Sequence, residues 1–477
     1  MPLKINHRLT ARGLLPKLHR LFELSRSKIL SLERTWNAAQ GAPVFTVRGR
    51  YTSRGWTEWT QGFQYGSVLL QFDATGEDEF LDLGRRQTIQ SMAAHVSHIG
   101  VHDHGFNIVS TYGNLWRLMR EGKIPPDEHE RNLYGLALKV SGAVQAARWS
   151  RCDHDKGYIY SFNGPHSLFI DTMRSLRSLA IAHQLGHVLM GERDQKISLL
   201  QRLIDHAETT AQYNVYYGQG RDAYDVSGRT AQESLFNLNG GSFRCPNSQQ
   251  GYSAFSTWSR GLAWAILGFA EQLEFLETLP VGDKSHRSNL RERVRPAPEA
   301  MSAKDVFLRA ALATADYYIA IAGADGIPLW DSGAPDAHRL GDYREHPADP
   351  FNSWEPVDSS AAVIAAQGLL RLGNYLSARG KRKPGTAYRQ AALTIADTLL
   401  QEPYLAVQPQ HQGLILHSVY HRPNGWDHVP RGQKVPNGES SMWGDYHARE
   451  LGLLLLREAQ REPYPTFFAA TPERRTG

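Results

Sequence analysis

Residues 359–376 read SSAAVIAAQGLLRLGNYL and indicate the fold class of the whole chain. Apolar residues recur there at spacings of three and four, and Ala and Leu, both strong helix formers, dominate. An apolar face wide enough to pack on two neighbours is formed by Ala361, Ala362, Ile364, Ala365, Leu369 and Leu372. The pattern predicts a helix that is buried among other helices.

The same periodicity returns along the chain. Further helices are predicted over residues 131–150, 175–190, 306–323 and 388–400. Loops that contain Pro and Gly separate the helical segments, over residues 157–165, 218–246, 326–356 and 423–438. About a dozen helices fit along the chain, and no run of β-branched strands occurs at regular spacing. The sequence therefore predicts an all-α fold, either a helical bundle or a closed ring of helical hairpins.

Composition bounds the class of protein. The chain has 477 residues, of which 41% are hydrophobic and 21% charged, which is ordinary for a globular protein. We expect a single barrel or bundle domain over residues 14–460, with an N-terminal extension over 1–13 and a polar tail over 461–477. Residues 282–300 are charged and contain Pro, but they do not divide the domain.

Charge and cysteine content exclude several partners. The net charge is only +5 and the basic residues are scattered, so no nucleic-acid partner is expected. No stretch approaches the roughly 20 apolar residues of a membrane span. Cys152 and Cys245 give no disulfide framework, and no CxxC pair suggests a metal. We expect a cytoplasmic protein, or a periplasmic one if a signal peptide has been removed.

Two short motifs contain an aspartate. Residues 102–106 (HDHGF) place it between two histidines at the end of an apolar stretch, and residues 170–176 (IDTMRSL) place it at the start of a strongly apolar helix. For Asp103 and Asp171 taken singly, a helix N-cap is the simplest interpretation. Two carboxylates beside one aromatic-lined pocket can instead have different pKa values, so that one donates a proton while the other stays ionised. The sequence by itself does not show that the two meet.

Three aromatic motifs point to a sugar. Residues 249–264 read QQGYSAFSTWSRGLAW and place Trp258 and Trp264 on either side of Arg260. Residues 56–63 (WTEWTQGF) and 440–447 (SSMWGDYH) also mix aromatic with hydrogen-bonding groups. Indole faces match the C–H faces of sugar rings, and the planar fork of Arg260 fits either a uronate or the backbone of a loop. Buried structural clusters are the alternative for each motif.

Other chemistries lack their motifs. The chain has no GxGxxG after a strand, no P-loop, no HExxH and no GxSxG. His183 and His187 lie four apart on a predicted helix, but no neighbouring acid accompanies them, so two structural histidines are expected rather than a metal site.

Taken in order, these motifs resemble the unsaturated glucuronyl hydrolases, glycoside hydrolase family 88, and more distantly the unsaturated rhamnogalacturonyl hydrolases. The resemblance runs from about Trp56 to Leu455 and is most specific over residues 250–264, because family members carry a very similar Gln-Gly followed by Ser-Thr-Trp-x-Arg-Gly-x-Ala-Trp. It is supported by residues 358–361 (DSSA) and 443–446 (WGDY). The resemblance implies an (α/α)6 barrel of six helical hairpins, and no metal or organic cofactor.

The resemblance also implies the reaction and the residues. Family members hydrate the C4=C5 double bond of an unsaturated uronic acid: a carboxylic acid protonates C4, water adds at C5, and the hemiketal opens to release the remaining chain. Asp171 matches the acid/base aspartate, and Asp103, preceded by His102, matches the second essential aspartate. The residues expected to bind the substrate are Trp59, His102, Phe162, Gln250, Trp258, Arg260, Trp264, Tyr420, Ser440, Ser441 and Trp443.

The chain departs from the family pattern in places. Gln64 and Phe162 stand where family members have Trp, and a family His has no clear match. Residues 221–236 are divergent, with Glu233 or Tyr224 near the expected place of that His. These differences leave the polysaccharide source, the linkage and the sulfation of the substrate open.

Two classes of alternative remain. The first is another enzyme on the same barrel, such as an unsaturated rhamnogalacturonyl hydrolase or a polysaccharide lyase. The second is a sugar-binding protein without catalysis. The expected partner is an unsaturated uronic-acid oligosaccharide, and the expected assembly is a monomer or a small homo-oligomer.

Overall fold

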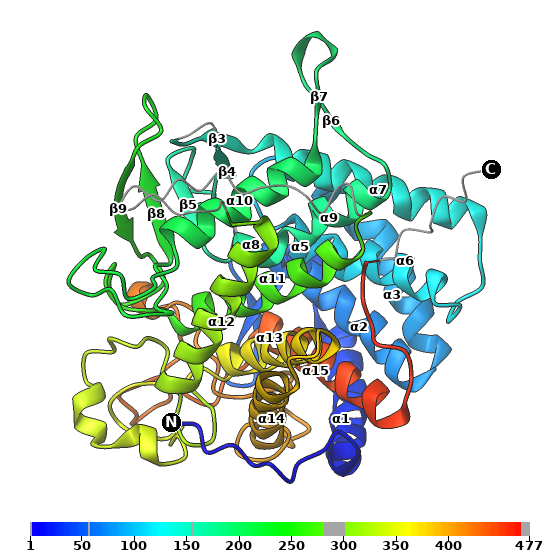
Figure 1. The fold of residues 1–477 in the computed structure, drawn as a ribbon. Coiled ribbons are helices and arrows are strands. Elements are labelled where there is room, and N and C mark those ends of the chain that lie inside the picture. The colour runs from blue at the N-terminus through cyan, green and yellow to red at the C-terminus, as the bar shows by residue number, and fades with distance from the viewer. Residues whose placement is uncertain (1, 56–57, 154–155, 281–300, 469–477) are drawn as a thin grey trace.

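The computed structural model describes residues 2–55, 58–153, 156–280 and 301–468. Within these ranges the fold is helical, with short strands between the helices (Figure 1). Three predicted features lie outside the described residues in whole or in part: Trp56 and Thr57 of the motif at 56–63, all of the charged segment 282–300, and residues 469–477 of the tail.

The helices form two concentric layers. The inner layer consists of α2 (Gln61–Thr75); α5 (His104–Asn107) with the π-helical turn η4 (Val109–Gly113) and α6 (Asn114–Arg120); α8 (Thr172–Ser175) with α9 (Arg177–Gln184); α11 (Ser259–Glu277); α13 (Ser359–Ala378); and α15 (Met442–Gln460). Each inner element packs against the next, and α15 packs against α2, which closes the ring. α11 and α13 are buried along almost their whole length, as helices with neighbours on every side must be.

The outer layer consists of α1 (Leu15–Thr35), α3 (Asp78–Ser91), α7 (Glu128–Ala147), α10 (Leu199–Tyr213), α12 (Ala303–Ile321) and α14 (Arg382–Leu399), and the short α4 (Ala93–Val96) follows α3. These helices bury one face against the inner ring and expose the other, and they alternate with the inner elements along the chain. Six consecutive helical hairpins result. The predicted (α/α)6 barrel is confirmed, and the closed ring replaces the bundle as the architecture.

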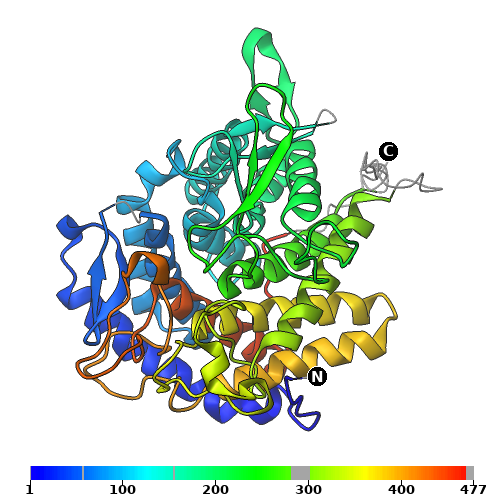
Figure 2. The same ribbon diagram turned by 90° about the vertical axis from the view of Figure 1, so that its left-hand side faces the viewer.

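Four of the five predicted helices correspond to α7, α12, α13 and α14. The prediction over 175–190 is wrong at its C-terminal end, because α9 stops at Gln184. Gly186 has a φ of 72°, and the His187 N–H donates to the Ala182 carbonyl at 3.0 Å, so the helix closes in a left-handed cap. The chain then enters the hairpin of β6 (Leu189–Met190) and β7 (Lys196–Ile197), which projects away from the helices (Figure 1, Figure 2).

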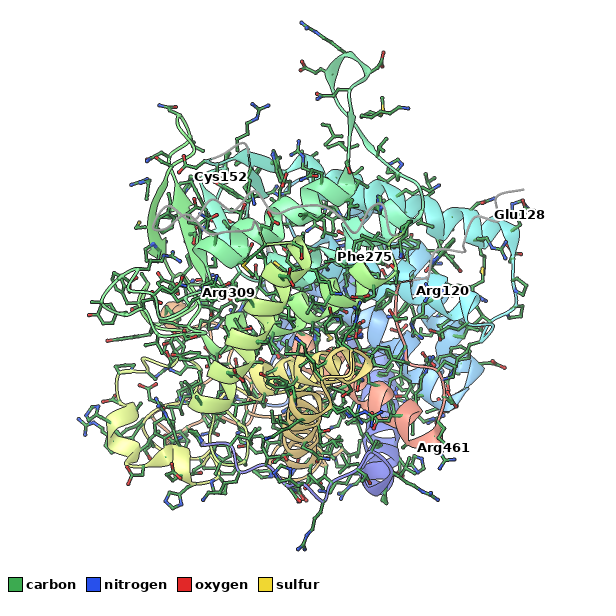
Figure 3. The ribbon with its side chains drawn as sticks, viewed as in Figure 1. Arg120, Glu128, Cys152, Phe275, Arg309 and Arg461 are labelled. Carbon is green, nitrogen blue, oxygen red and sulfur yellow. The ribbon has the colours of Figure 1, made fainter. Side chains whose placement is uncertain are left out.

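The remaining strands lie in the connections between helices. β1 (Pro43–Val47) pairs with β2 (Arg50–Ser53), and β3 (Trp149–Arg151) pairs with β4 (Gly157–Ile159), both antiparallel. A three-stranded antiparallel sheet has the order β5 (Ser167–Phe169), β8 (Glu233–Phe236), β9 (Phe243–Asn247). Cys152, next to β3, is buried with its sulfur 3.9 Å from the Thr209 hydroxyl of α10 (Figure 3). Strands of three to five residues are too short to leave a period in the sequence.

Segments near both ends of the chain pack on the barrel. The Leu3 side chain is buried, and its N–H donates to the Ile319 carbonyl of α12 at 3.4 Å. Phe467, after α15, lies under the guanidinium groups of Arg117 and Arg177. Among the residues described, no helix combines the length and the apolar character that crossing a membrane requires.

Candidate active site

A cavity of about 450 Å³ opens at the end of the barrel where the inner helices begin. Its lining consists of Trp59, His98, Gly100, Val101, His102, Asp103, Phe106, Phe162, Asp171, Gln249, Gln250, Trp258, Arg260, Trp264, Tyr420, His421, Asn424 and Trp426. Several of these residues directly precede an inner helix, as Asp103, Asp171 and Trp258 do. The barrel thus gathers the N-terminal ends of distant helices around one space.

Asp103 and Asp171 meet at the floor of this cavity. Each occupies the N-cap position of a short helix, α5 or α8, but neither side chain makes a capping hydrogen bond. The Nε2 atom of His102 lies 3.2 Å from Oδ1 of Asp171 and 3.8 Å from Oδ1 of Asp103. The capping interpretation holds for the position of both aspartates along the chain but is wrong for their carboxylates, which both approach the Nε2 atom of His102.

Asp103 and His102 both have shifted pKa values. Burial raises the pKa of Asp103, the charge of His102 opposes this, and the negative charge of Asp171 adds to the rise. Burial alone would lower the pKa of His102, but the two carboxylates together raise it above its ordinary value. The site therefore contains a carboxyl group that holds its proton to higher pH than an exposed aspartate does, beside an imidazole that favours its charged form.

Close approach of α5 and α8 brings the aspartates together. A Cβ atom at Gly105 would lie 2.4 Å from the Ser175 carbonyl oxygen, so only glycine permits this contact. The Gly105 N–H donates to the Ser175 hydroxyl at 2.8 Å, and the Gln145 amide donates to the His102 carbonyl at 2.9 Å. The glycine of the HDHGF motif is thus a packing requirement of the site.

Aromatic rings line the cavity. Trp59 stacks on Trp443 with ring centroids 5.1 Å apart, Phe106 packs on Trp264 at 4.9 Å, and Phe162 stacks over His102 at 6.0 Å. These rings supply flat apolar surfaces on several sides of the aspartates.

Three predicted substrate-binding residues lie behind this wall and not in the cavity lining. Trp443 is fully buried and donates from Nε1 to the Ser360 hydroxyl at 3.0 Å, so it supports Trp59 from the rear. The Ser440 hydroxyl donates to the Ile415 carbonyl at 2.7 Å, and the Ser441 hydroxyl accepts from the Gly444 N–H as the N-cap of α15. Their hydroxyl groups serve the backbone before α15.

Arg260 is held by the protein on every side. Its guanidinium lies between the rings of Trp258 and Trp443, 4.6 and 4.7 Å from their centroids. It donates to the Tyr420 carbonyl at 2.8 Å, to the Val419 carbonyl, and to Oε1 of Gln250 at 3.1 Å.

Asp358 completes the surroundings of Arg260 at 3.5 Å. Of the two roles predicted for Arg260, the geometry gives it that of a loop anchor. Because Oε1 of Gln250 is occupied by Arg260, the NH2 group of Gln250 is the part left to donate to a ligand.

The divergent region contributes a buried carboxylate. Glu233, on β8, accepts from the Asn163 amide at 2.9 Å and the Asn247 amide at 2.6 Å, and from the Ser167 hydroxyl. Gln249, which lines the cavity, donates to it at 3.5 Å. Glu233 thus supports the cavity without being part of its lining, whereas Tyr224 is exposed and packs on Phe255.

Gln64 and Phe162, which stand where the family pattern has Trp, differ in their effect on the cavity. Phe162 lines the cavity, so Phe in place of Trp changes the cavity wall. Gln64 faces a separate, small space beside Lys28 and Tyr51, where it accepts from the Gln61 amide at 2.5 Å. The departure at Gln64 therefore does not touch the site.

Several lining residues carry no recognisable signal in the sequence. His98, Gly100 and Val101 come from the connection after α4, and His421, Asn424 and Trp426 come from the connection before α15. No sequence spacing relates these residues to the aspartates. The one signal that could have indicated them is the cluster of aromatic side chains formed by Tyr420, His421 and Trp426. Among the described residues, no group of three or more His, Cys, Asp or Glu side chains is placed to hold a metal ion.

An (α/α)6 barrel that encloses paired carboxylates in an aromatic cavity has the features of a carbohydrate-processing enzyme. No family model matches the chain. The chain is 23% identical over 396 residues to an unsaturated glucuronyl hydrolase of Formosa agariphila, covering 82% of this chain and 78% of that protein. It is also 23% identical over 419 residues to an unsaturated glucuronyl hydrolase of Bacillus sp. strain GL1, covering 86% and 89%.

Solved structures extend the comparison to the fold. The structure of an unsaturated glucuronyl hydrolase described as specific for heparin superposes with a TM-score of 0.68 at 18% identity, covering 94% of this chain and 100% of that one. The resemblance to the unsaturated glucuronyl hydrolases that the motifs indicated is confirmed by sequence similarity along most of the chain and by the fold.

Proposed function

We propose that this protein is a hydrolase that removes the terminal 4,5-unsaturated uronic acid from oligosaccharides released by polysaccharide lyases. The observation that carries the proposal is the contact of His102 with Asp171 and Asp103 at the floor of an aromatic cavity. Proton transfer to carbon requires a carboxyl group that keeps its proton, and in this pair burial raises the pKa of Asp103. The similarity to unsaturated glucuronyl hydrolases supports the same reaction.

The proposed chemistry is hydration of the double bond. A carboxylic acid gives its proton to C4, the π electrons form the new C–H bond, and positive charge develops at C5 and the ring oxygen. A water molecule then adds its oxygen to C5 and gives a proton back to the carboxylate. The product is a hemiketal, which opens and releases the remaining sugar chain.

We assign proton donation and return to Asp171, following the resemblance, and the placement of water to Asp103. His102 links the two, and the raised pKa of Asp103 lets the group as a whole keep a proton at higher pH than a free aspartate would. Trp59, Trp258, Trp264 and Phe162 would pack on the sugar faces.

The electrostatics of the cavity suit an acidic sugar. Trp258, which lines the cavity, is the N-cap of α11, so the N-terminal end of this helix, which carries partial positive charge, lies at the site. The NH2 group of Gln250 can donate to the uronate carboxylate, because its Oε1 is fixed by Arg260.

A spectrophotometric assay tests the proposal. The conjugated double bond absorbs in the ultraviolet, so an unsaturated disaccharide should lose this absorbance when the protein is added. A lyase would create absorbance from an intact polysaccharide, and a binding protein would change neither. A panel of unsaturated disaccharides from glycosaminoglycan, ulvan, gellan, xanthan and pectin lyases would identify the substrate; no loss with any of them would overturn the proposal. The cytoplasmic location, the oligomeric state and the domain boundaries stay predictions.

A further inference from the structure

One wall of the cavity is formed by a segment that precedes α15. Tyr420, His421, Asn424 and Trp426 all line the cavity and lie within seven residues of one another. The segment contains only the short 3-10 helix η9 (Arg422–Asn424), so its shape depends on contacts made by side chains.

Two oppositely charged side chains hold this wall at the same peptide groups. Arg260, at the start of α11, donates to the carbonyl groups of Val419 and Tyr420. Asp427 accepts the Tyr420 N–H on Oδ1 at 2.5 Å and the His421 N–H on Oδ2 at 3.1 Å. The cation thus fixes the carbonyl side of the segment and the anion fixes its amide side.

We propose that Asp427 is a positioning residue for the substrate: together with Arg260 it holds the wall from Tyr420 to Trp426 at the place where that wall contacts the sugar. The inference rests on the proposed function, because its measure is the affinity for an unsaturated disaccharide. Asp427 itself does not line the cavity, so its effect passes through the wall.

The role requires a carboxylate and not merely a polar side chain. Each oxygen of Asp427 accepts a different backbone N–H, and charge-assisted hydrogen bonds of this type are stronger than neutral ones. An asparagine would keep one acceptor and turn an NH2 group toward the other N–H. The segment would then leave one donor unsatisfied and shift the rings of Tyr420, His421 and Trp426.

The surroundings of Asp427 make its hold on the wall sensitive to pH. Burial raises its pKa to about 6, although the two N–H groups and Arg260 favour the charged form. The charged and titratable groups around it are Arg260 of α11, Asp358 before α13, and Tyr420 and His421 of its own segment. Above pH 6 the carboxylate accepts both N–H groups. Below pH 6 one oxygen carries a proton and the charge-assisted bonds are lost, so the wall is held more weakly and KM is expected to rise.

The experiment compares the KM and kcat of Asp427→Asn with those of wild type between pH 5 and 8. We expect KM to rise about tenfold at pH 7.5 with kcat changed less than about twofold, and the rise of KM below pH 6 to be absent from the variant. Asp225→Asn is the matched control. Asp225 also accepts backbone N–H groups, from Gly218, Gln219 and Arg221, but its loop does not line the cavity.

Three outcomes overturn the inference: an unchanged KM in Asp427→Asn, an equal rise of KM in Asp225→Asn, or a fall of kcat alone. If Asp427→Asn does not fold, the wild-type profile decides, and a KM that stays constant from pH 7.5 to 5 contradicts the role. Failure of the proposed function is seen separately, because wild type would then leave the ultraviolet absorbance of every disaccharide unchanged.

Discussion

The Nε2 atom of His102 lies 3.2 Å from Oδ1 of Asp171, although the two residues are 69 positions apart in the chain. The same nitrogen is 3.8 Å from Asp103, so one imidazole links both carboxylates. This contact brings two aspartates that start different helices to one imidazole. The predictions below separate the roles of its members from the roles of the residues that hold them.

Replacing either aspartate should abolish turnover. Asp171→Asn removes the group that we assign to proton donation, and Asp103→Asn removes its partner, so kcat is expected to fall by about 10²–10⁴-fold in each variant. The measurement is the loss of ultraviolet absorbance from an unsaturated disaccharide, with circular dichroism to verify the fold. Full activity in Asp171→Asn would refute its assignment.

His102 should tune the pH dependence of the reaction. Its positive charge lowers the pKa of Asp103 against the effects of burial and of Asp171. In His102→Gln that opposition is lost, so the pKa of Asp103 should rise. The pair would then keep its shared proton to higher pH, and the basic limb of the kcat/KM profile should move to higher pH. A limb that moves to lower pH would contradict this coupling. His338→Gln, at an exposed position outside the cavity lining, is the control and should leave the limb in place.

The contact between α5 and α8 should depend on glycine. In Gly105→Ala the added Cβ would lie 2.4 Å from the Ser175 carbonyl oxygen, so the two helices must separate. We expect the free energy of unfolding to fall by about 1–3 kcal/mol and kcat to fall with it, because the aspartates move apart. Chemical denaturation and the absorbance assay measure the two effects.

Gly135→Ala in α7 is the matched control for that variant. Its Cβ would meet Trp116 at 3.5 Å, an ordinary contact, and alanine is the better helix former by about 1 kcal/mol. It should therefore keep its activity and unfold no more easily than wild type. Equal losses in both variants would show that Gly105 has no special place in the site.

Arg260 should act on affinity through the wall that it anchors. Lysine cannot reproduce a planar guanidinium that stacks between two indoles and donates to two carbonyl groups, so Arg260→Lys should raise KM by about tenfold or more. Arg229→Lys is the control, since Arg229 also stacks on an aromatic ring, 3.6 Å from the centroid of Tyr216, but outside the cavity lining. Unchanged KM and kcat in Arg260→Lys would show that Arg260 does not anchor this wall.

Local patterns predicted much of the architecture. The apolar periodicity of residues 359–376 matches the buried helix α13, and the resemblance indicated that the helices close into a ring. The end of α9 was missed although Gly186 marks it, because the periodicity continues past the glycine. The short strands were missed because three residues cannot establish a period.

The sequence predicted which residues belong to the site better than it predicted what each residue does there. The aspartates, Trp59 and Gln250 were placed by motif, and the structure puts them in one cavity. Ser440, Ser441 and Trp443 belong to an equally polar and aromatic motif, yet they lie behind the wall: the two serines bond the backbone, and Trp443 donates to the Ser360 hydroxyl. A motif identifies the chemistry of a side chain but not the direction in which it points.

The sequence alone determined several of the helices and which loops carry acids and indoles, since these properties depend on neighbours within one or two turns. Only the tertiary structure decided that His102 meets Asp171, and that Arg260 reaches the carbonyl of Tyr420, a residue 160 positions later. Contacts at such separations follow from the closure of the barrel, which brings the starts of distant inner helices to one end. No local period encodes them, because they depend on how whole hairpins pack against each other.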